Sequence, residues 1–401
     1  MTQLFAQHGY SLGNKISDAL TLKVINGVIF GPRDILPEQI TSRIVEYRKI
    51  SNSVECMIDP QYYAYSLANK SDARLGNLIG YPYFSAKRRS DLEREGFVKQ
   101  EIKTCLDFQK EFDLNFLVAP NILISRSFNS IEGVIAKHFF RQVGELKNDY
   151  DKPVYASLVI SRDALLEKEE LDIFLEEVTS CDAYPDGVYL LVAAQSSEAR
   201  LDIYNADVIA GCLLINHAFK VSSIDVINGY SDILTPLLGC VGAKAGATGW
   251  WSNLRTFSLD RFQPNDGGGR QPNQRYLSAQ LLNRLNYVEF HRLRGGFPGI
   301  VNGLPSDQYY PLQNGSEPER VKEVLQSWDA LNRLCNQINS HDAGVNLGAF
   351  MGRVKKAKEL YEKIEAETLM PLEEKSKGFH LDALEQAVTV FCQKAEIVIG
   401  N

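Results

Sequence analysis

The chain has 401 residues, of which 44% are hydrophobic and 23% are charged, so its composition is that of a globular protein and excludes wholesale disorder. Its 43 Lys and Arg against 50 Asp and Glu give a net charge of −7, which argues against a whole-surface grip on nucleic acid but leaves room for a local basic patch. No run approaches the roughly 18 apolar residues of a membrane span, and residues 1–20 lack the apolar core of a signal peptide. We therefore expect a cytoplasmic protein without membrane contact.

Seven β-rich runs alternate with helical patterns over the first 260 residues. Most of these runs are continuously apolar, as is typical of strands buried on both faces. Their alternation with amphipathic segments predicts a parallel sheet with right-handed crossovers. The predicted strands are 24–31, 54–59, 115–120, 154–160, 188–194, 223–228 and 243–248.

A closed (βα)8 TIM-like barrel and an open doubly wound parallel sheet both fit this alternation. Residues 1–263 favour the barrel, because about 250 residues is its usual length. The eighth strand is then expected within the first twenty residues or after residue 285. Residues 264–274, which contain three consecutive glycines between prolines, predict a linker or an active-site lid.

Residues 275–401 predict a helical C-terminal region. The helical patterns in it are 275–294, 317–340, 346–367 and 378–398. Seven scattered cysteines without a CxxC pair are typical of buried reduced thiols, and the six histidines show no HxxxH or HxH spacing. A zinc site built from neighbouring ligands is disfavoured, and the sequence leaves the cofactor undetermined.

Ligands of parallel α/β folds bind beyond the carboxyl ends of the strands, and this rule selects the candidate residues. The acidic candidates for catalysis are Asp59, Asp163 and Asp232. Asp59 directly follows an apolar strand, so desolvation would raise its pKa toward that of a general base; the alternative is a carboxylate that caps the next turn before Pro60. The candidate ligand-binding residues are Arg33, Asn121, Arg126, Arg162, Asn228, Tyr230, Gly246, Thr248, Trp250, Trp251 and Arg255. Each of them could equally be part of a solvated rim.

The segment 229–255 combines small residues, two tryptophans and an arginine. Its GAKAGATG run would let a ligand approach the backbone closely, as on the phosphate-binding late loops of barrels. Trp250 and Trp251 could stack on a base, with Arg255 one helical turn further on. Alternatively, the small residues serve tight packing and the tryptophans plug the barrel end.

Residues 81–94 cluster four basic residues just after aromatic ones. This pattern allows a contact with nucleic acid or phosphate, whereas the acidic residues Asp91, Glu93 and Glu95 favour an exposed helix start.

Three segments resemble the tRNA-guanine transglycosylase barrels. MIDPQYYA (57–64) is similar to the segment that carries that family's catalytic base. The run 229–255 is similar in layout to the family's last strand pair. YLSAQLLNRLNYVEFHRL (276–293) is similar to a late helix of the family, with Glu289 and Leu293 at comparable spacing. The resemblance covers under a fifth of the chain. It implies a barrel whose mouth accepts a nucleobase or nucleotide, with Asp59 as acid/base. The family's nucleophilic aspartate is missing near Gly246–Thr248, and no cysteine lies between Cys240 and Cys335 to build its zinc site.

Two hypotheses for function follow. The first is a TIM-barrel enzyme, or a degenerate enzyme, that acts on or binds a nucleotide, nucleobase or phosphate-bearing substrate at the carboxyl face of the barrel. Its reaction would be glycosyl transfer or hydrolysis on a nucleotide or nucleic acid. The second is a non-catalytic barrel scaffold or binding subunit of a protein complex, which contacts a protein partner through the helical C-terminal region. A further alternative is a nucleic-acid-binding module that uses residues 81–94, Trp250 and Trp251.

Overall fold

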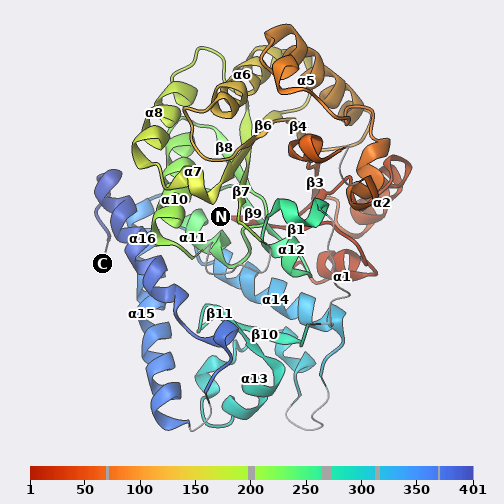
Figure 1. Cartoon of the computed structure of the whole chain (residues 1–401). Coiled ribbons are helices and arrows are strands. Elements are labelled where there is room, and N and C mark those ends of the chain that lie inside the picture. Colours follow the sequence, from red (N-terminus) through yellow and green to blue (C-terminus); the bar gives the residue numbers. More distant parts are fainter. Residues whose placement is uncertain (69–71, 197–203, 264–271, 312–316, 369–370, 401) are drawn as a thin grey trace.

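The computed structural model describes residues 1–68, 72–196, 204–263, 272–311, 317–368 and 371–400. Eight parallel strands form a nearly closed (βα)8 barrel (Figure 1). Around the barrel they follow the order β3-β2-β1-β9-β8-β7-β6-β4. Their bounds are β1 Gln3–Gln7, β2 Gly27–Phe30, β3 Glu55–Ile58, β4 Leu117–Ala119, β6 Val154–Ser161, β7 Gly187–Ala193, β8 Asp225–Asn228 and β9 Ala245–Thr248, and the short β5 (Leu123–Ile124) also pairs with β6. The TIM-like barrel prediction is confirmed.

The missing strand of the sequence prediction is β1, in the first of the two predicted places. It pairs in parallel with β2 on one side and with β9 on the other, so it joins the beginning of the barrel to its end. Only three apolar residues, Leu4, Phe5 and Ala6, lie between Gln3 and Gln7 in this strand, so it does not stand out in the sequence as an apolar run.

The barrel closes between β3 and the residues before β4. The backbone N–H of Asn115 donates to the Cys56 carbonyl at 2.9 Å, and the Cys56 N–H donates to the side-chain oxygen of Asn115 at the same distance. The Asn115 side chain therefore takes the place of a backbone carbonyl as acceptor for the Cys56 N–H, at the point where the parallel strand pairing ends.

Replacing Asn115 with alanine should lower the free energy of unfolding by about 1–2 kcal/mol, because the Cys56 N–H would lose its acceptor. Urea unfolding measures this change. The exposed Asn148 offers a matched Asn→Ala control, which should change stability by less than about 0.5 kcal/mol. Equal effects of the two substitutions would show that the side-chain bond does not contribute to closure.

Helices surround the barrel on its outside. The longer ones are α1 Lys15–Thr21, α2 Pro37–Ile50, α5 Glu95–Lys110, α6 Ile131–Leu146, α8 Lys168–Thr179, α10 Ala206–Val221 and α11 Thr235–Cys240, with the short α3 Asp72–Leu75, α4 Arg89–Leu92, α7 Arg162–Leu165 and α12 Ser252–Arg255 between them. The unusually apolar α10 packs against β8 on one side and against the C-terminal helix α16 (His380–Lys394) on the other. All seven cysteines are free, and five are buried.

The C-terminal region begins with a hairpin, so the helix predicted over 275–294 is wrong for its first part. Residues 275–294 contain strands β10 (Arg275–Ser278) and β11 (Asn283–Asn286), paired antiparallel, and only then helix α13 (Tyr287–Leu293). Two interactions explain why the helix begins only at Tyr287. The buried Gln326 side-chain amide pairs with both the N–H and the carbonyl of Leu277 in β10, and Asn286 is the N-cap residue of α13. Long-range hydrogen bonds thus stabilise a hairpin where the spacing of the leucines predicts a helix.

Three long helices complete this region: α14 (Arg320–Cys335), α15 (Ala343–Glu367) and α16. Figure 1 shows α14 lying between the barrel and the hairpin, and it contacts α1, β1 and α11 on one side and β10 on the other. The predicted linker or lid lies mostly outside the described residues. Within the described residues, no helix is both long and apolar enough to cross a membrane.

Candidate functional site

The centre of the barrel mouth is filled by side chains. Asp59 follows β3 and has no exposed surface. Its carboxylate accepts hydrogen bonds from the Gln61 N–H at 3.0 Å, the Tyr63 hydroxyl at 2.9 Å and the Tyr189 hydroxyl at 3.3 Å. The rings of Phe257 and Phe262 pack on Tyr63 from the segment after β9. Asp59 is therefore sealed beneath an aromatic layer.

Burial raises the pKa of Asp59 to about 6, and the three hydrogen bonds and the nearby charge of Arg261 offset part of that rise. The direction agrees with the prediction from the sequence. The expected role needs contact with a substrate, and the fully buried carboxylate offers none in this conformation.

Arg261 holds the layer over Asp59. It lies in a 3₁₀ turn, Leu259–Phe262, and its side chain is 1% exposed. One nitrogen pairs with Asp34 at 2.7 Å and another donates to the Tyr230 hydroxyl at 2.9 Å. The turn is thereby tied to the loops after β2 and β8.

An open cleft lies beside this layer, between the barrel mouth and the C-terminal region. We call it the mouth cleft; its volume is about 570 Å³. Barrel loops supply one wall and the hairpin, α14 and residues 373–375 the other. Its lining residues are Tyr204, Tyr230, Ser231, Asp232, Ile233, Leu234, Trp250, Trp251, Ser252, Arg255, Thr256, Pro272, Asn273, Arg275, Arg284, Arg320, Glu323, Glu373 and Lys375.

Cationic side chains outnumber carboxylates in the described lining of the mouth cleft, five to three. Arg284 binds Asp232 through two nitrogens, at 2.6 and 2.8 Å. Arg275 pairs with Glu373 at 2.6 Å, and Arg320 pairs with Glu323. The formal charge of the described lining is therefore positive by two.

The pKa of Asp232 is lowered. Burial by itself would raise it, but the charges of Arg284 and Arg255 and a hydrogen bond from Thr248 outweigh the burial. The pKa of Glu373 is also lowered, because hydrogen bonding from Asn286 and the charge of Arg275 exceed the effect of its partial burial. Both groups are ionised at neutral pH, and neither is suited to donate a proton.

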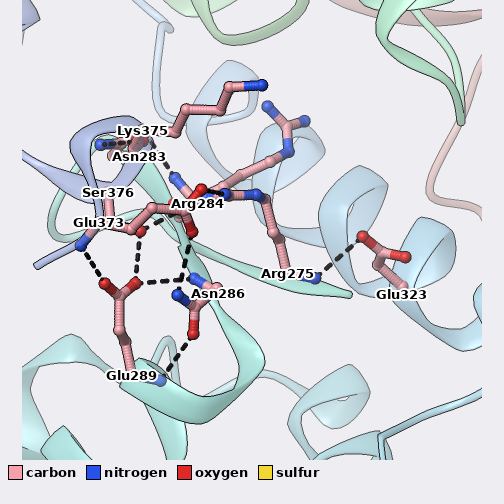
Figure 2. Close-up of polar contacts among 9 residues, drawn as sticks. All are labelled: Arg275, Asn283, Arg284, Asn286, Glu289, Glu323, Glu373, Lys375 and Ser376. Carbon is pink, nitrogen blue, oxygen red and sulfur yellow. Dashed lines mark hydrogen bonds and ion pairs between the residues drawn. The ribbon is translucent and has the colours of Figure 1, made fainter. Parts of the chain in front are cut away.

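The C-terminal wall is a connected polar network (Figure 2). Glu289 on α13 accepts from the Asn286 N–H at 3.1 Å and contacts the Ser376 hydroxyl, which fixes residues 373–376 on the hairpin. Figure 2 shows the side chains of Arg284 and Lys375 extending from this network to the same side, away from Glu289. The hydrogen bonds of this network therefore hold in place the segments that carry Arg284 and Lys375.

The loop after β8 is strained where it meets the mouth cleft. Tyr230 and Asp232 have φ values of 55° and 43°, in the left-handed region that residues other than glycine rarely adopt. Such strain is commonly found at functional sites, where the surrounding structure enforces it. Here the Arg261–Tyr230 and Arg284–Asp232 bonds hold both residues in place.

The structure brings five of the residues selected from the sequence to the mouth cleft: Tyr230, Asp232, Trp250, Trp251 and Arg255. Thr248 does not line the mouth cleft, but its hydroxyl donates a hydrogen bond to the lining residue Asp232 at 2.6 Å. Trp250 is 4% exposed and donates its indole N–H to the Tyr10 carbonyl, so it is a packing residue, whereas Trp251 is partly exposed. Arg33 lines a separate cavity.

The other selected residues lie elsewhere. Asn121 and Asn228 are buried and bond to the protein itself: Asn121 to the Ser157 carbonyl, and Asn228 to Asn216 of α10. A side chain on Gly246 would collide with Thr235 at 2.3 Å, so the small residue serves close packing. Arg126 and Asp163 are exposed, Arg162 is half-buried, and none of the three lines the mouth cleft.

The 81–94 segment has an internal structural role. Tyr81 and Tyr83 are buried, and three of its basic residues pair with acidic ones: Lys87 with Glu101, Arg89 with Glu132 and Arg94 with Asp91. These contacts favour the exposed helix start over the nucleic-acid contact.

Sequence reasoning missed the whole C-terminal wall and Arg261. Arg275, Arg284 and Arg320 fall within helices predicted from the sequence, Lys375 falls between two of them, and none of the four was a candidate site residue. RYLS and NRLN show no strict alternation of polar and apolar residues, so the sequence offers no strong signal for this hairpin.

Comparison with known proteins adds no functional assignment. No protein-family model and no curated protein matches the chain. Among solved structures, the chain is similar to a glycoside hydrolase family 3 β-N-acetylglucosaminidase from Paenibacillus sp. str. FPU-7, with 10% identity, TM-score 0.38, and coverage of 97% of this chain and 67% of that one. It is also similar to dihydrodipicolinate synthase from Oceanobacillus iheyensis, with 12% identity, TM-score 0.31, and coverage of 97% and 96%. Likeness at this level carries no inference about substrate.

No group of three or more His, Cys, Asp or Glu side chains that could hold a metal ion occurs among the described residues.

Proposed function

We propose that the protein binds a nucleotide, with its phosphate and base both held in the mouth cleft. The observation that carries this proposal is the excess of cationic side chains beside a partly exposed indole, in a cavity of about 570 Å³. That volume lies within the range typical of small-molecule sites, roughly 300–1,000 Å³.

Arg255 and Lys375 would bind the phosphate. They belong to a lining in which cationic side chains outnumber carboxylates five to three, and the charge of Arg255 helps to lower the pKa of Asp232. An arginine can donate two parallel hydrogen bonds to a phosphate, which makes it the stronger anchor of the two.

Trp251 would contact the base. The guanidinium of Arg320 lies 5.8 Å from the centre of its ring, so the indole is held in place by a cation on one side. A base that stacks on such a ring gains about 1–3 kcal/mol.

Binding is favoured here over acid catalysis within the cleft, because its carboxylates Asp232 and Glu373 are held ionised by arginines. Acid–base chemistry through Asp59, as the transglycosylase resemblance implies, would need the aromatic layer to move. A protein partner for the C-terminal region stays a prediction.

Titration calorimetry with adenosine 5′-monophosphate (AMP) tests the proposal. We expect measurable binding that weakens as salt rises, since the phosphate is held by charge. Replacing Arg255 with glutamine should weaken binding about tenfold, the effect of one lost charge-assisted hydrogen bond.

Arg126→Gln is the matched control. Arg126 is also an arginine beyond a strand end, but it is exposed and does not line the cleft, so its loss should leave the affinity unchanged. If the folded protein fails to bind AMP at millimolar concentration, or if both variants bind equally weakly, the proposal is wrong.

A further inference from the structure

A large open cavity lies at the end of the barrel opposite the mouth cleft. Its volume is about 870 Å³. Its walls include Thr2 just before β1, Asp225 at the start of β8 and Lys244 just before β9, whereas the mouth cleft lies beyond the ends of these strands. Further walls come from the C-terminal ends of α10 and α11 and the N-terminal end of α15, which lie on one side of the barrel (Figure 1). A partner bound here would not compete with a ligand of the mouth cleft.

Four large aliphatic side chains are exposed at this cavity and beside it. Val221 and Val398 line the cavity and are 70% and 87% exposed. Val345, in the first turn of α15, and Ile399 are 50% and 39% exposed, and the backbone of Gly400 lies against Val345. Exposed apolar side chains that gather on one surface are typical of an interaction site.

Two exposed charged residues, Lys220 and Asp342, also line the cavity. We call the surface formed by these two residues and the four aliphatic ones the amino-end face. It combines an apolar surface with one cation and one carboxylate.

The tail that carries Val398 is fixed on α15. The Gly400 N–H donates to the Gly344 carbonyl at 3.0 Å. The tail backbone approaches the helix so closely that a side chain at Gly344 would meet the Val398 carbonyl at 2.2 Å. A side chain at Gly348, one turn further, would meet the Gly400 carbonyl at 2.0 Å. The exposure of Val398 is therefore imposed by close packing, and a partner that covers it pays little for ordering the tail.

The charges around this cavity are balanced. Its described lining contains two lysines and two aspartates, on a chain whose net charge is −7. Lys244 and Asp225 pair with each other at 3.0 Å. Since net charge of one sign keeps copies of a protein apart, a neutral apolar face is the place where two copies of this chain can approach.

Lys220 and Asp342 suit a contact with twofold symmetry. Neither forms an ion pair with any residue in the described part of the chain, and they lie on different elements, at the end of α10 and just before α15. In a twofold dimer both copies use the same surface, so that each contact occurs twice. Lys220 of each copy would then meet Asp342 of the partner subunit.

We propose that the amino-end face is the contact surface of a twofold dimer of this chain. The exposed aliphatic side chains of the two copies pack against one another, and two reciprocal Lys220–Asp342 ion pairs fix their orientation. Both mouth clefts stay open in this dimer, because they lie at the opposite ends of the two barrels.

Sedimentation velocity of the full chain at concentrations up to about 100 μM tests the proposal. The wild-type protein should sediment with the mass of two chains. Val398→Asp should raise the dissociation constant of the dimer about a hundredfold, because a carboxylate from each copy would lose its water against apolar side chains. Val45→Asp is the matched control: Val45 is 49% exposed on α2, which contributes no residue to the amino-end face, so the dimer should persist unchanged.

Val221→Asp provides an independent variant at the end of α10, in case Val398→Asp loosens the tail, and it should weaken the dimer equally. A wild-type protein that stays monomeric at about 100 μM would overturn the proposal. A dimer that neither substitution weakens would also overturn it, because the contact would then use another surface. Masses that keep growing beyond two chains would contradict the twofold arrangement.

Lys220→Gln, Asp342→Asn and the double variant test the reciprocal ion pairs. Asparagine can still cap α15 by accepting from the Val345 N–H, as Asp342 does, so this substitution removes the charge and keeps the helix start. Each single substitution should weaken the dimer about tenfold, since two pairs are lost at once, and the double variant should be no weaker than either single one. Additive losses would show that Lys220 and Asp342 do not pair across the dimer.

Discussion

Replacing Arg261 with methionine should lower the free energy of unfolding by about 3 kcal/mol or more. We expect this to be the largest loss from any single substitution of a polar residue at the barrel mouth. The guanidinium is 1% exposed and bonds to Asp34 and to the Tyr230 hydroxyl. Methionine fills much of the same volume, so the loss reports the polar contacts more than a cavity. It leaves Asp34 with Arg33 alone and removes the cation nearest to Asp59.

Urea unfolding followed by circular dichroism measures this loss. Arg89→Met is the matched control, because Arg89 pairs with Glu132 at 3.5 Å on the surface, with its side chain 56% exposed. Exposed ion pairs contribute about 0–1 kcal/mol, so this substitution should have little effect. A loss below about 1 kcal/mol in Arg261→Met would show that the arginine does not hold the mouth closed.

The barrel could be predicted from the sequence because its strands are buried on both faces and therefore read as apolar runs. The carboxyl-end rule then placed Asp232, Trp251 and Arg255 on one side of the barrel, where the structure has the mouth cleft. The rule selects an end of the barrel but not the direction of each side chain. Asn228 illustrates this, because it ends a strand and yet points outward to Asn216 of α10.

The closed mouth and the C-terminal wall could not be predicted from periodicity. Arg261 acts through contacts with Asp34 and Tyr230, which are 227 and 31 residues away along the chain. Arg284 reaches the barrel only because residues 275–286 form a hairpin, and that hairpin depends on Gln326 of α14. Long-range polar contacts of this kind leave no local spacing in the sequence.

The contributions of Asp59 and His8 to the stability of the wild-type protein should nearly cancel between pH 4 and pH 7, because burial shifts the pKa values of these two groups of the barrel mouth in opposite directions. Burial raises the pKa of Asp59 to about 6, from an ordinary 3.8. Burial also lowers the pKa of His8 to about 4, from an ordinary 6.5, with opposing influences from Asp34 and Arg43.

The signs follow from the protons that each state binds. Between pH 4 and 6 the folded protein holds a proton on Asp59 that the unfolded chain has lost, so this group favours folding at low pH and its contribution is lost as pH rises. Over nearly the same range the unfolded chain binds a proton on His8 that the folded protein excludes, so this contribution is lost as pH falls. Each effect amounts to about 3 kcal/mol, at about 1.4 kcal/mol for each unit of pKa difference.

Two substitutions separate the opposing effects. Asp59→Asn removes the acidic titration, so the free energy of unfolding of this variant should rise by about 3 kcal/mol from pH 4 to pH 7, driven by His8. His8→Gln removes the other titration, and this variant should lose about 3 kcal/mol over the same range. Urea unfolding in a series of buffers measures both profiles against the wild-type one.

Each substitution also removes hydrogen bonds and so lowers the free energy of unfolding at every pH. Such a loss shifts the whole stability profile without changing its slope against pH, so the slopes of the variants can still be compared. Exposed carboxylates titrate alike in all three proteins and cancel between them. Parallel profiles for the two variants would show that neither group is buried in the protonation state described here. Opposite slopes would show that Asp59 is protonated and His8 neutral in the folded protein near pH 5. They would also place a carboxyl group with a pKa near 6 under the aromatic layer, where any movement of residues 257–262 would expose it.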